Sequence, residues 1–192
     1  MADSNPELTW QRLTAAHRDP NPEPEPEHSP AAAILACSDA RVPPSVIFDQ
    51  LAGSLFVVRH AGNTARPGSV ASLDYAVYHL GVDLVIVMGH TGCGAVTAAL
   101  NGPDVDPVLE PILGPIRPAL AGLDPTDPDA LDKAVSANVA NTMSELASHP
   151  GPCGTGIRAG TVQLRGALHD LTTGELRAID DRLNSPTKRE IQ

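Results

Sequence analysis

Two short apolar segments, each followed closely by residues that bind metals, constrain this chain more than any other feature. Residues 31–36 (AAAILA) run directly into Cys37, and residues 84–88 (LVIVM) are followed by His90 and Cys93. Apolar runs of this length are typical of buried strands. Two thiolates and an imidazole at strand ends can converge on one metal ion, and zinc accepts both kinds of ligand. The pattern therefore predicts a metal site made of Cys37, His90 and Cys93.

An acidic and a basic residue follow the first cysteine, in the segment C-S-D-A-R that spans residues 37–41. A catalytic zinc site has three protein ligands and one open position, whereas a structural site is normally closed by a fourth protein ligand. The obvious fourth ligand is Asp39, and Arg41 is suited to pair with it because a guanidinium can meet a carboxylate bidentately. We therefore expect a catalytic site flanked by Asp39 and Arg41, rather than a closed structural site or buried thiols.

Strand-like and helical segments alternate along most of the chain. Helices are expected in residues 6–17, 42–50, 67–80, 94–100 and 128–148, and strands in residues 31–36, 54–59, 82–88, 161–168 and 176–179, the last after a turn at residues 172–174. This alternation predicts an α/β fold with a mostly parallel sheet of four to five strands flanked by helices. Ligands of such sheets bind beyond the carboxyl ends of the strands, which is where the zinc ligands stand. Residues 151–160 are expected to form a loop.

The distribution of prolines and charges predicts two regions. Residues 1–30 would hold an N-terminal helix and a Pro- and Glu-rich arm, and residues 31–192 a single catalytic domain. Hydrophobic residues make up 42% of the 192 residues but aromatic residues only 3%, so the core must consist of Ala, Val, Leu and Ile. The formal net charge of −10 disfavours nucleic acid and anionic membranes as partners.

Cysteine usage bears on the compartment. Of the three cysteines, Cys37 and Cys93 lie beside other potential metal ligands, and Cys153 stands alone, so a disulfide framework is not expected. Residues 1–19 lack the apolar centre of a signal peptide, and the longest apolar runs are far shorter than a membrane span. These features predict a cytoplasmic protein without a membrane partner.

The motifs C-S-D-A-R (37–41), F-V-V-R-H-A-G-N (56–63) and G-H-T-G-C-G-A (89–95) together resemble the β-class carbonic anhydrases of bacterial type. The segment R-G-A-L-H-D-L-T-T-G-E-L (165–176) resembles the last strand pair of that family. The resemblance implies one Zn²⁺ per chain, held by the two cysteines and the histidine, and a paired Asp39–Arg41 dyad. It also implies reversible hydration of carbon dioxide to bicarbonate and a proton, by a zinc-bound hydroxide that the dyad orients.

The resemblance extends to the substrate pocket and the assembly. Pocket positions of the family fall on Phe56, Ala61, Tyr75 and Gly94, and His28 stands where many members carry a glutamine. Members are usually homodimers or tetramers, with N-terminal helices that cross onto the partner subunit. We therefore expect carbon dioxide or bicarbonate as the small-molecule substrate and a second copy of the chain as the partner.

A subgroup of the family closes its zinc site through a bicarbonate pocket made of a Trp, an Arg and a Tyr. Arg59 and Tyr75 match the last two, but Ile34 stands at the position of the Trp. The pocket is therefore incomplete, and an open site is expected in which water or hydroxide is the fourth ligand. Asp39 would bind zinc only in a closed form.

Two alternatives keep the same fold and metal. One is a hydrolase of a carbon dioxide analogue, such as carbon disulfide or carbonyl sulfide, which would differ only in its access channel. The other is a non-catalytic module that binds zinc or senses bicarbonate. The intact pair of Asp39 and Arg41 counts against the non-catalytic alternative.

Overall fold

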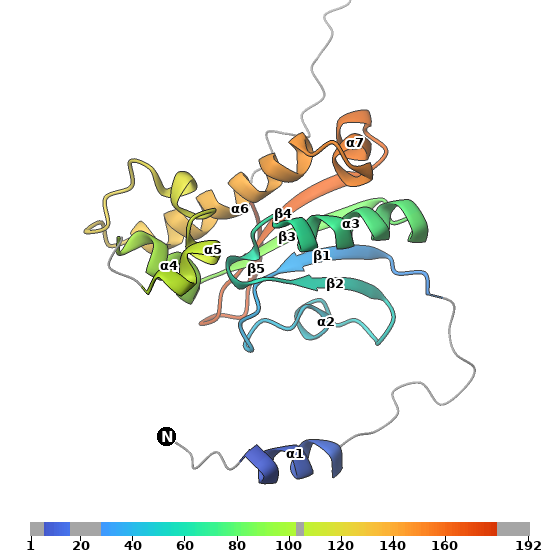
Figure 1. Ribbon diagram of the computed structural model, residues 1–192, viewed down its shortest axis with the longest axis horizontal. Helices are drawn as coiled ribbons and strands as arrows, with labels where there is room; N and C mark the ends of the chain where they lie inside the picture. Colours follow the sequence, from blue (N-terminus) through green and yellow to red (C-terminus); the bar gives the residue numbers. More distant parts are fainter. Residues whose placement is uncertain (1–5, 16–27, 103–105, 180–192) are drawn as a thin grey trace, which may run out of the picture.

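The computed structural model describes residues 6–15, 28–102 and 106–179, and its centre is a five-stranded sheet (Figure 1). The strands are β1 (Ala32–Ala36), β2 (Leu55–Arg59), β3 (Leu84–His90), β4 (Gln163–His169) and β5 (Leu176–Ile179). They lie in the order β2-β1-β3-β4-β5, and all neighbours are parallel except β4 and β5. The predicted fold class is thus confirmed, and the strand expected after the turn at residues 172–174 is the antiparallel edge strand β5.

Helices cover both faces of the sheet. Figure 1 shows α2 on one side of the sheet and α3, α6 and α7 on the other. The α-helices are α1 (Pro6–Ala15), α2 (Pro44–Ile47), α3 (Pro67–Leu80), α4 (Gly94–Leu100), α5 (Glu110–Leu113), α6 (Ala130–Ser148) and α7 (Pro152–Ala159). Three 3₁₀ turns complete the described elements: η1 (Ala61–Asn63), η2 (Pro107–Leu109) and η3 (Arg117–Leu120).

The core is made of small and branched aliphatic side chains, as the low aromatic content predicts. Every residue of β1 is buried, because β1 lies between β2 and β3 and has helices over both faces. Alternate residues of the strand therefore belong to different clusters: Leu35 belongs to the same cluster as Leu73 of α3, and Ile34 to the same cluster as Val96 of α4. A strand buried on both faces reads as one continuous apolar run, which is why residues 31–36 predict it so clearly.

A glycine lets α6 pack closely on the strand that carries the histidine ligand. A Cβ atom at Gly89 of β3 would lie only 2.7 Å from Val139 Cγ2 and 3.0 Å from Val135 Cγ1. Any other residue would push the helix away from the sheet. Gly89 immediately precedes His90, so this contact also places α6 next to the predicted metal site.

The expected loop at residues 151–160 is wrong, because residues 152–159 form the helix α7. Its two internal glycines lower the helix propensity, so the sequence of this segment does not predict a helix. Tertiary contacts supply what propensity lacks: the Asp74 carboxylate of α3 accepts a hydrogen bond from the Cys153 amide at 2.8 Å, which caps the first turn. Gly154 permits the packing, since a Cβ atom there would lie 2.1 Å from the His149 carbonyl oxygen.

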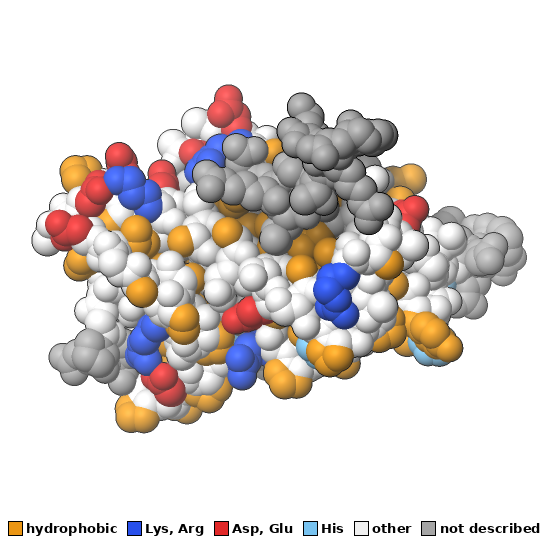
Figure 2. All heavy atoms as spheres, turned by 90° about the horizontal axis from the view of Figure 1, so that it is seen from above, with side chains coloured by type: hydrophobic (Ala, Val, Ile, Leu, Met, Phe, Trp, Pro, Cys, Tyr) orange, Lys and Arg blue, Asp and Glu red, His pale blue; other side chains and the backbone are white. Residues whose placement is uncertain are grey.

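The N-terminal helix expected in residues 6–17 is present as α1. Most of the Pro- and Glu-rich arm lies outside the described residues, and the division into two regions stays a prediction. None of the helices in the described segments is long and apolar enough to cross a membrane. On the face drawn in Figure 2, the Lys and Arg side chains are scattered among acidic ones and do not gather into one basic patch.

Candidate metal centre

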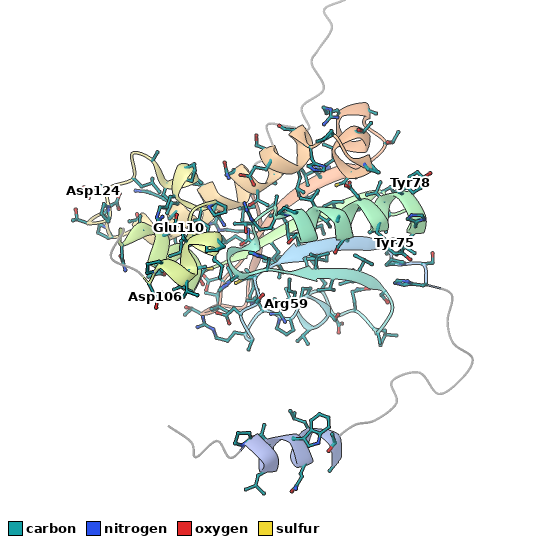
Figure 3. All side chains as sticks on the ribbon, viewed as in Figure 1. Arg59, Tyr75, Tyr78, Asp106, Glu110 and Asp124 are labelled. Carbon is teal, nitrogen blue, oxygen red and sulfur yellow. The ribbon has the colours of Figure 1, made fainter. Side chains whose placement is uncertain are left out.

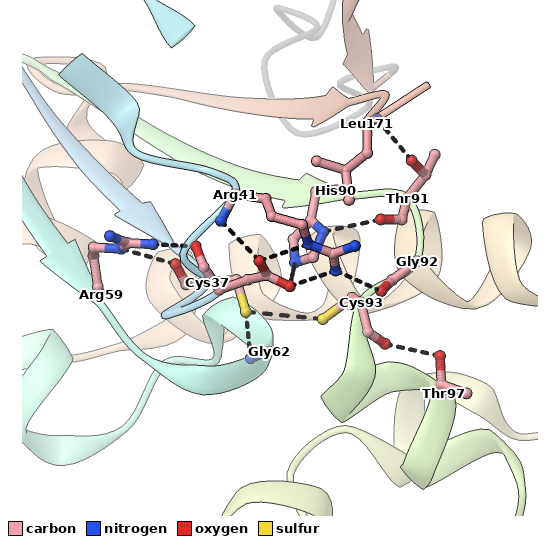
Figure 4. Close-up of polar contacts among 11 residues, drawn as sticks. Cys37, Arg41, Arg59, Gly62, His90, Thr91, Gly92, Cys93, Thr97 and Leu171 are labelled. Atoms are coloured by element: carbon pink, nitrogen blue, oxygen red, sulfur yellow. Dashed lines mark hydrogen bonds and ion pairs between the residues drawn. The ribbon is translucent and has the colours of Figure 1, made fainter. Parts of the chain in front are cut away.

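The three predicted ligands meet at the carboxyl edge of the sheet (Figure 4). Cys37 follows β1, His90 is the last residue of β3, and Cys93 precedes the first residue of α4. Since β1 and β3 are neighbouring parallel strands, their carboxyl ends lie together. The three ligand atoms lie within 4.8 Å of one another, and all three residues are buried. Within the described ranges, this is the one group of three or more His, Cys, Asp or Glu side chains close enough to share a metal ion.

The spacing of these atoms fits zinc. The two sulfur atoms are 3.9 Å apart, far beyond the ~2 Å of a disulfide bond. Two thiolates on one tetrahedral zinc ion, each about 2.3 Å from the metal, would lie about 3.8 Å apart. His90 Nδ1 lies 2.9 Å from the Thr91 carbonyl oxygen, to which it can only donate. Its Nε2 is buried without a hydrogen-bond partner in the described part of the chain, which leaves a lone pair for a metal.

A hydrogen bond joins the sulfur atoms of Cys37 and Cys93. The pKa of Cys37 is lowered, first by the hydrogen bond with Cys93 and also by the Gly62 amide, which donates to Cys37 Sγ at 3.4 Å. The same shared hydrogen bond, together with burial, raises the pKa of Cys93. A metal ion must displace the proton of this hydrogen bond, because only the thiolate is a strong zinc ligand. The arrangement is therefore a closely spaced pair of sulfurs, 3.9 Å apart, of which Cys37 is the more easily ionised.

Asp39 lies over the ligands and is held by Arg41. The guanidinium donates through Nε to Oδ1 at 2.9 Å and through Nη2 to Oδ2 at 2.6 Å, and the Arg41 backbone amide also donates to Oδ1 at 2.9 Å. These bonds, led by those from the side chain, hold the pKa of Asp39 well below its usual range. Oδ2 lies 4.0 Å from His90 Nε2. An ionised carboxylate is thus fixed beside the ligand triad.

Comparison with known proteins agrees with this geometry. A family model described as carbonic anhydrase matches residues 32–176. The carbonic anhydrase of Mycolicibacterium smegmatis is 30% identical over 199 residues, which cover 92% of this chain and 94% of that protein.

The chain belongs to the β-carbonic anhydrases.

Solved structures of β-carbonic anhydrases share its fold. Coccomyxa β-carbonic anhydrase, solved in complex with acetazolamide, aligns with a TM-score of 0.74 and 26% identity, over 93% of this chain and 87% of that one. One of two tetrameric β-carbonic anhydrases from the fungus Sordaria macrospora aligns with a TM-score of 0.71 and 24% identity, over 91% of this chain and 87% of that one. The family comprises lyases, so the prediction of a catalytic rather than a structural metal site is supported at the level of the family.

In this β-carbonic anhydrase, Arg59 anchors the loop that carries the first ligand and the dyad. Arg59 stands at the end of β2, next to β1, and its Nε donates to the Cys37 carbonyl oxygen at 2.9 Å. Its Nη2 donates to the Asp39 carbonyl oxygen. The resemblance connects Arg59 with a bicarbonate pocket, whereas its described contacts are with backbone. Ile34, at the position of the Trp of that pocket, is fully buried in the core.

The predicted pocket residues fall into two groups. Ala61 and Gly94 are next to the metal centre: Ala61 begins the turn whose Gly62 amide contacts Cys37 Sγ, and Gly94 follows Cys93. The other three, His28, Phe56 and Tyr75, form an aromatic row instead. The ring centroids of His28 and Phe56 are 6.2 Å apart, and those of Phe56 and Tyr75 are 6.1 Å apart.

This aromatic row lies at the other end of the strands from the chain's own ligands. Phe56 pairs in register with Ala33, four residues before Cys37, which places it on the order of 13 Å along the strand from the metal centre. Figure 3 shows Tyr75 and Arg59 toward opposite ends of the sheet. A pocket role for His28, Phe56 and Tyr75 stays a prediction, and within one chain they do not face the metal centre.

Two residues that contact the segments around the ligands, Thr91 and Asn138, are not among the predicted site residues. Thr91 links the histidine loop to the end of the sheet, because its Oγ1 accepts the Leu171 amide at 2.9 Å. Asn138 of α6 donates to the Gly62 carbonyl oxygen at 2.8 Å. The one signal for Asn138 is its place on the apolar stripe of α6, between Val135 and Val139, where a polar side chain is unusual.

Proposed function

We propose that this chain catalyses the reversible hydration of carbon dioxide to bicarbonate and a proton, with one zinc ion held by Cys37, His90 and Cys93. The main observation behind this proposal is the buried ligand triad, whose ligand atoms lie within 4.8 Å of one another beside the Asp39 carboxylate that is paired with Arg41. The membership of the chain in the carbonic anhydrase family supports the same reaction. Zinc is supported by the donor set of two sulfurs and one nitrogen and by their spacing.

When bound, zinc would supply the Lewis acid that makes water a good nucleophile near neutral pH, a property for which carbonic anhydrases are the reference example. The protein would supply three ligands and leave the fourth position to solvent. An ionised carboxylate can only accept hydrogen bonds, so Asp39 accepts one from the oxygen atom that attacks the substrate. This bond orients the attacking oxygen so that one of its lone pairs points toward the carbon of the substrate. Arg41 keeps that carboxylate away from the metal by engaging both of its oxygens.

The position of the dyad suits entry and exit of a small substrate. The side chain of Arg41 is 58% exposed and that of Asp39 18%, while His90 is fully buried. The ligands are thus buried, whereas the dyad beside them is partly exposed to solvent. Arg41 Nη2 also lies 3.4 Å from the Gly92 carbonyl oxygen, so one guanidinium spans the two loops that carry the ligands.

Stopped-flow hydration assays test this function. We expect the zinc-loaded protein to hydrate carbon dioxide, the same preparation stripped by a chelator to fall to the uncatalysed rate, and activity to return with added zinc. Carbonyl sulfide and carbon disulfide, offered to the same loaded protein, serve as competing substrates. A protein with one zinc per chain that hydrates nothing, or that consumes only the sulfur-containing gases, would refute the proposal.

We also propose that the protein is a homo-oligomer in which a second copy completes the substrate pocket. The resemblance places His28, Phe56 and Tyr75 in that pocket, and in one chain they lie away from the ligands. The tetrameric assembly of the Sordaria macrospora structure with the same fold supports this arrangement. The helix α1 supports it too, because Leu8, Trp10 and Leu13 are each at least 60% exposed, and exposed apolar side chains that lie together are typical of a protein–protein contact.

Replacing Leu8, Trp10 and Leu13 together by Ser is therefore expected to convert the oligomer to monomers and to remove most of the hydration activity. Mass measured by light scattering at several concentrations, together with the hydration rate, checks this. Val108→Ser is the matched control, because Val108 is 72% exposed on another part of the surface. An oligomer that persists in the triple variant, or a fully active monomer, would argue against the proposal.

A further inference from the structure

A fully buried asparagine connects the long helix α6 to the metal centre. Asn138 has no exposed surface, and its Nδ2 donates to the Gly62 carbonyl oxygen at 2.8 Å. The Gly62 amide in turn donates to Cys37 Sγ at 3.4 Å. The two bonds use the groups on either side of the Gly62 Cα atom, so fixing the carbonyl limits how the amide can point.

The turn that makes these contacts needs support from outside. Gly62 has φ +73° and the next residue, Asn63, has φ +46°, so two successive residues adopt the left-handed region. For a non-glycine residue such as Asn63 this conformation is uncommon, and it persists where surrounding contacts determine it. A Cβ atom at Gly62 would also lie 2.6 Å from Ile116 Cδ1, so the turn is enclosed on that side as well.

Packing alone does not explain an amide at this position. The neighbours of Asn138 on α6, Val135 and Val139, are buried aliphatic residues that pack on β3 at Gly89. A buried amide is costly unless it is hydrogen-bonded, and a leucine would fill such a position without that cost. Within the described segments, the side-chain amide of Asn138 makes one hydrogen bond, from Nδ2 to Gly62, and its Oδ1 has no hydrogen-bond partner.

We propose that Asn138 is a positioning residue for the metal centre, acting through Gly62 on the thiolate of Cys37. An amide that donates to a ligating thiolate orients the sulfur and draws off part of its charge. Outer contacts of this kind typically change metal affinity or activity by about 10- to 100-fold when removed. The inference rests on the proposed zinc site, but it concerns a residue of α6 that is 76 residues from Gly62 in the sequence.

Metal affinity, measured without substrate, tests this role. Asn138→Leu keeps a side chain of similar size and removes the donor. We expect its zinc affinity, in competition with a chromophoric chelator, to be about 10- to 100-fold weaker than that of the unmodified protein. In the cobalt-substituted protein, the sulfur-to-metal charge-transfer bands should shift, because the thiolate loses a hydrogen bond.

Thr142→Val is the matched control. Thr142 lies one helical turn after Asn138, is also fully buried, and its Oγ1 has no protein partner in the described residues. This variant should bind zinc and cobalt as the unmodified protein does. Asn138→Ala carries the same test if the leucine variant does not fold, and thermal unfolding of the metal-free proteins shows which variants are folded.

The outcomes separate this inference from the proposed function. Normal zinc affinity in a folded Asn138 variant, or an equal loss in Thr142→Val, would overturn the positioning role. An unmodified protein that fails to bind zinc would overturn it together with the zinc site. A protein that binds zinc but does not hydrate carbon dioxide would refute the proposed function alone, because the affinity measurement does not involve the reaction.

Discussion

Cys93→Ser is expected to lose zinc and to hydrate carbon dioxide no faster than the buffer does. Cys93 is buried, and its sulfur lies 3.9 Å from that of Cys37, so it supplies one of only two sulfurs in a three-ligand site. A serine hydroxyl is not ionised near neutral pH and is a poor substitute for a thiolate. Loss of a direct ligand should weaken zinc binding by more than the ~100-fold that marks the upper range for outer contacts. Zinc content after dialysis and stopped-flow hydration measure the two effects.

The third cysteine provides the control for this variant. Cys153 is as deeply buried as Cys93 and lies in α7, and burial, followed by the charge of Asp74, raises the pKa of its thiol to about 12. It is therefore a protonated core thiol and is no part of the ligand triad. Cys153→Ala should keep one zinc per chain and the hydration rate. Retention of full zinc binding by Cys93→Ser would show that the metal, if any, is held elsewhere.

Asp39→Asn and Arg41→Ala are expected to keep zinc and to lose about 10²- to 10³-fold in kcat, the range seen when one hydrogen-bond donor that stabilises a transition state is removed. The asparagine keeps the shape of the carboxylate but loses its charge and one acceptor. Arg41→Ala leaves the carboxylate intact but frees it. Asp39 Oδ2 already lies 4.0 Å from His90 Nε2, so a freed carboxylate can turn toward the metal and occupy the open position.

The two variants should therefore fail for different reasons. X-ray absorption of the zinc-loaded proteins should show two sulfurs, one nitrogen and one light ligand in both, and a crystal structure should assign that light ligand to Asp39 only in Arg41→Ala. Lys133→Ala is the control, because Lys133 also forms an exposed ion pair, with Asp127, away from the metal centre. Unchanged turnover in zinc-loaded Arg41→Ala would contradict the role of the dyad.

The elements and the ligand triad were predictable because their signals are local. Each strand next to the site is a short apolar run, and Cys37 and His90 stand at or just beyond the ends of β1 and β3. Parallel strands bring their carboxyl ends to one edge, so the convergence of the ligands follows once the strands are recognised. The dyad is equally local, since Asp39 and Arg41 are two residues apart and pair across their own loop.

Other features depend on contacts between residues that are far apart in the sequence. The helix α7 contains two glycines and is capped by Asp74, which is 79 residues earlier in the chain. The local sequence of residues 152–159 therefore does not predict a helix. His28, Phe56 and Tyr75, whose pocket role stays a prediction, stand close to the ligand motifs in the sequence, but the direction of the strands carries them to the ends opposite the ligands. Asn138 of α6 reaches the Gly62 turn from a helix that packs closely on β3 at Gly89. The sequence by itself thus determined which residues can hold the metal, whereas only the tertiary structure decided what supports them, because that support comes from side-chain contacts that leave no periodic or local pattern.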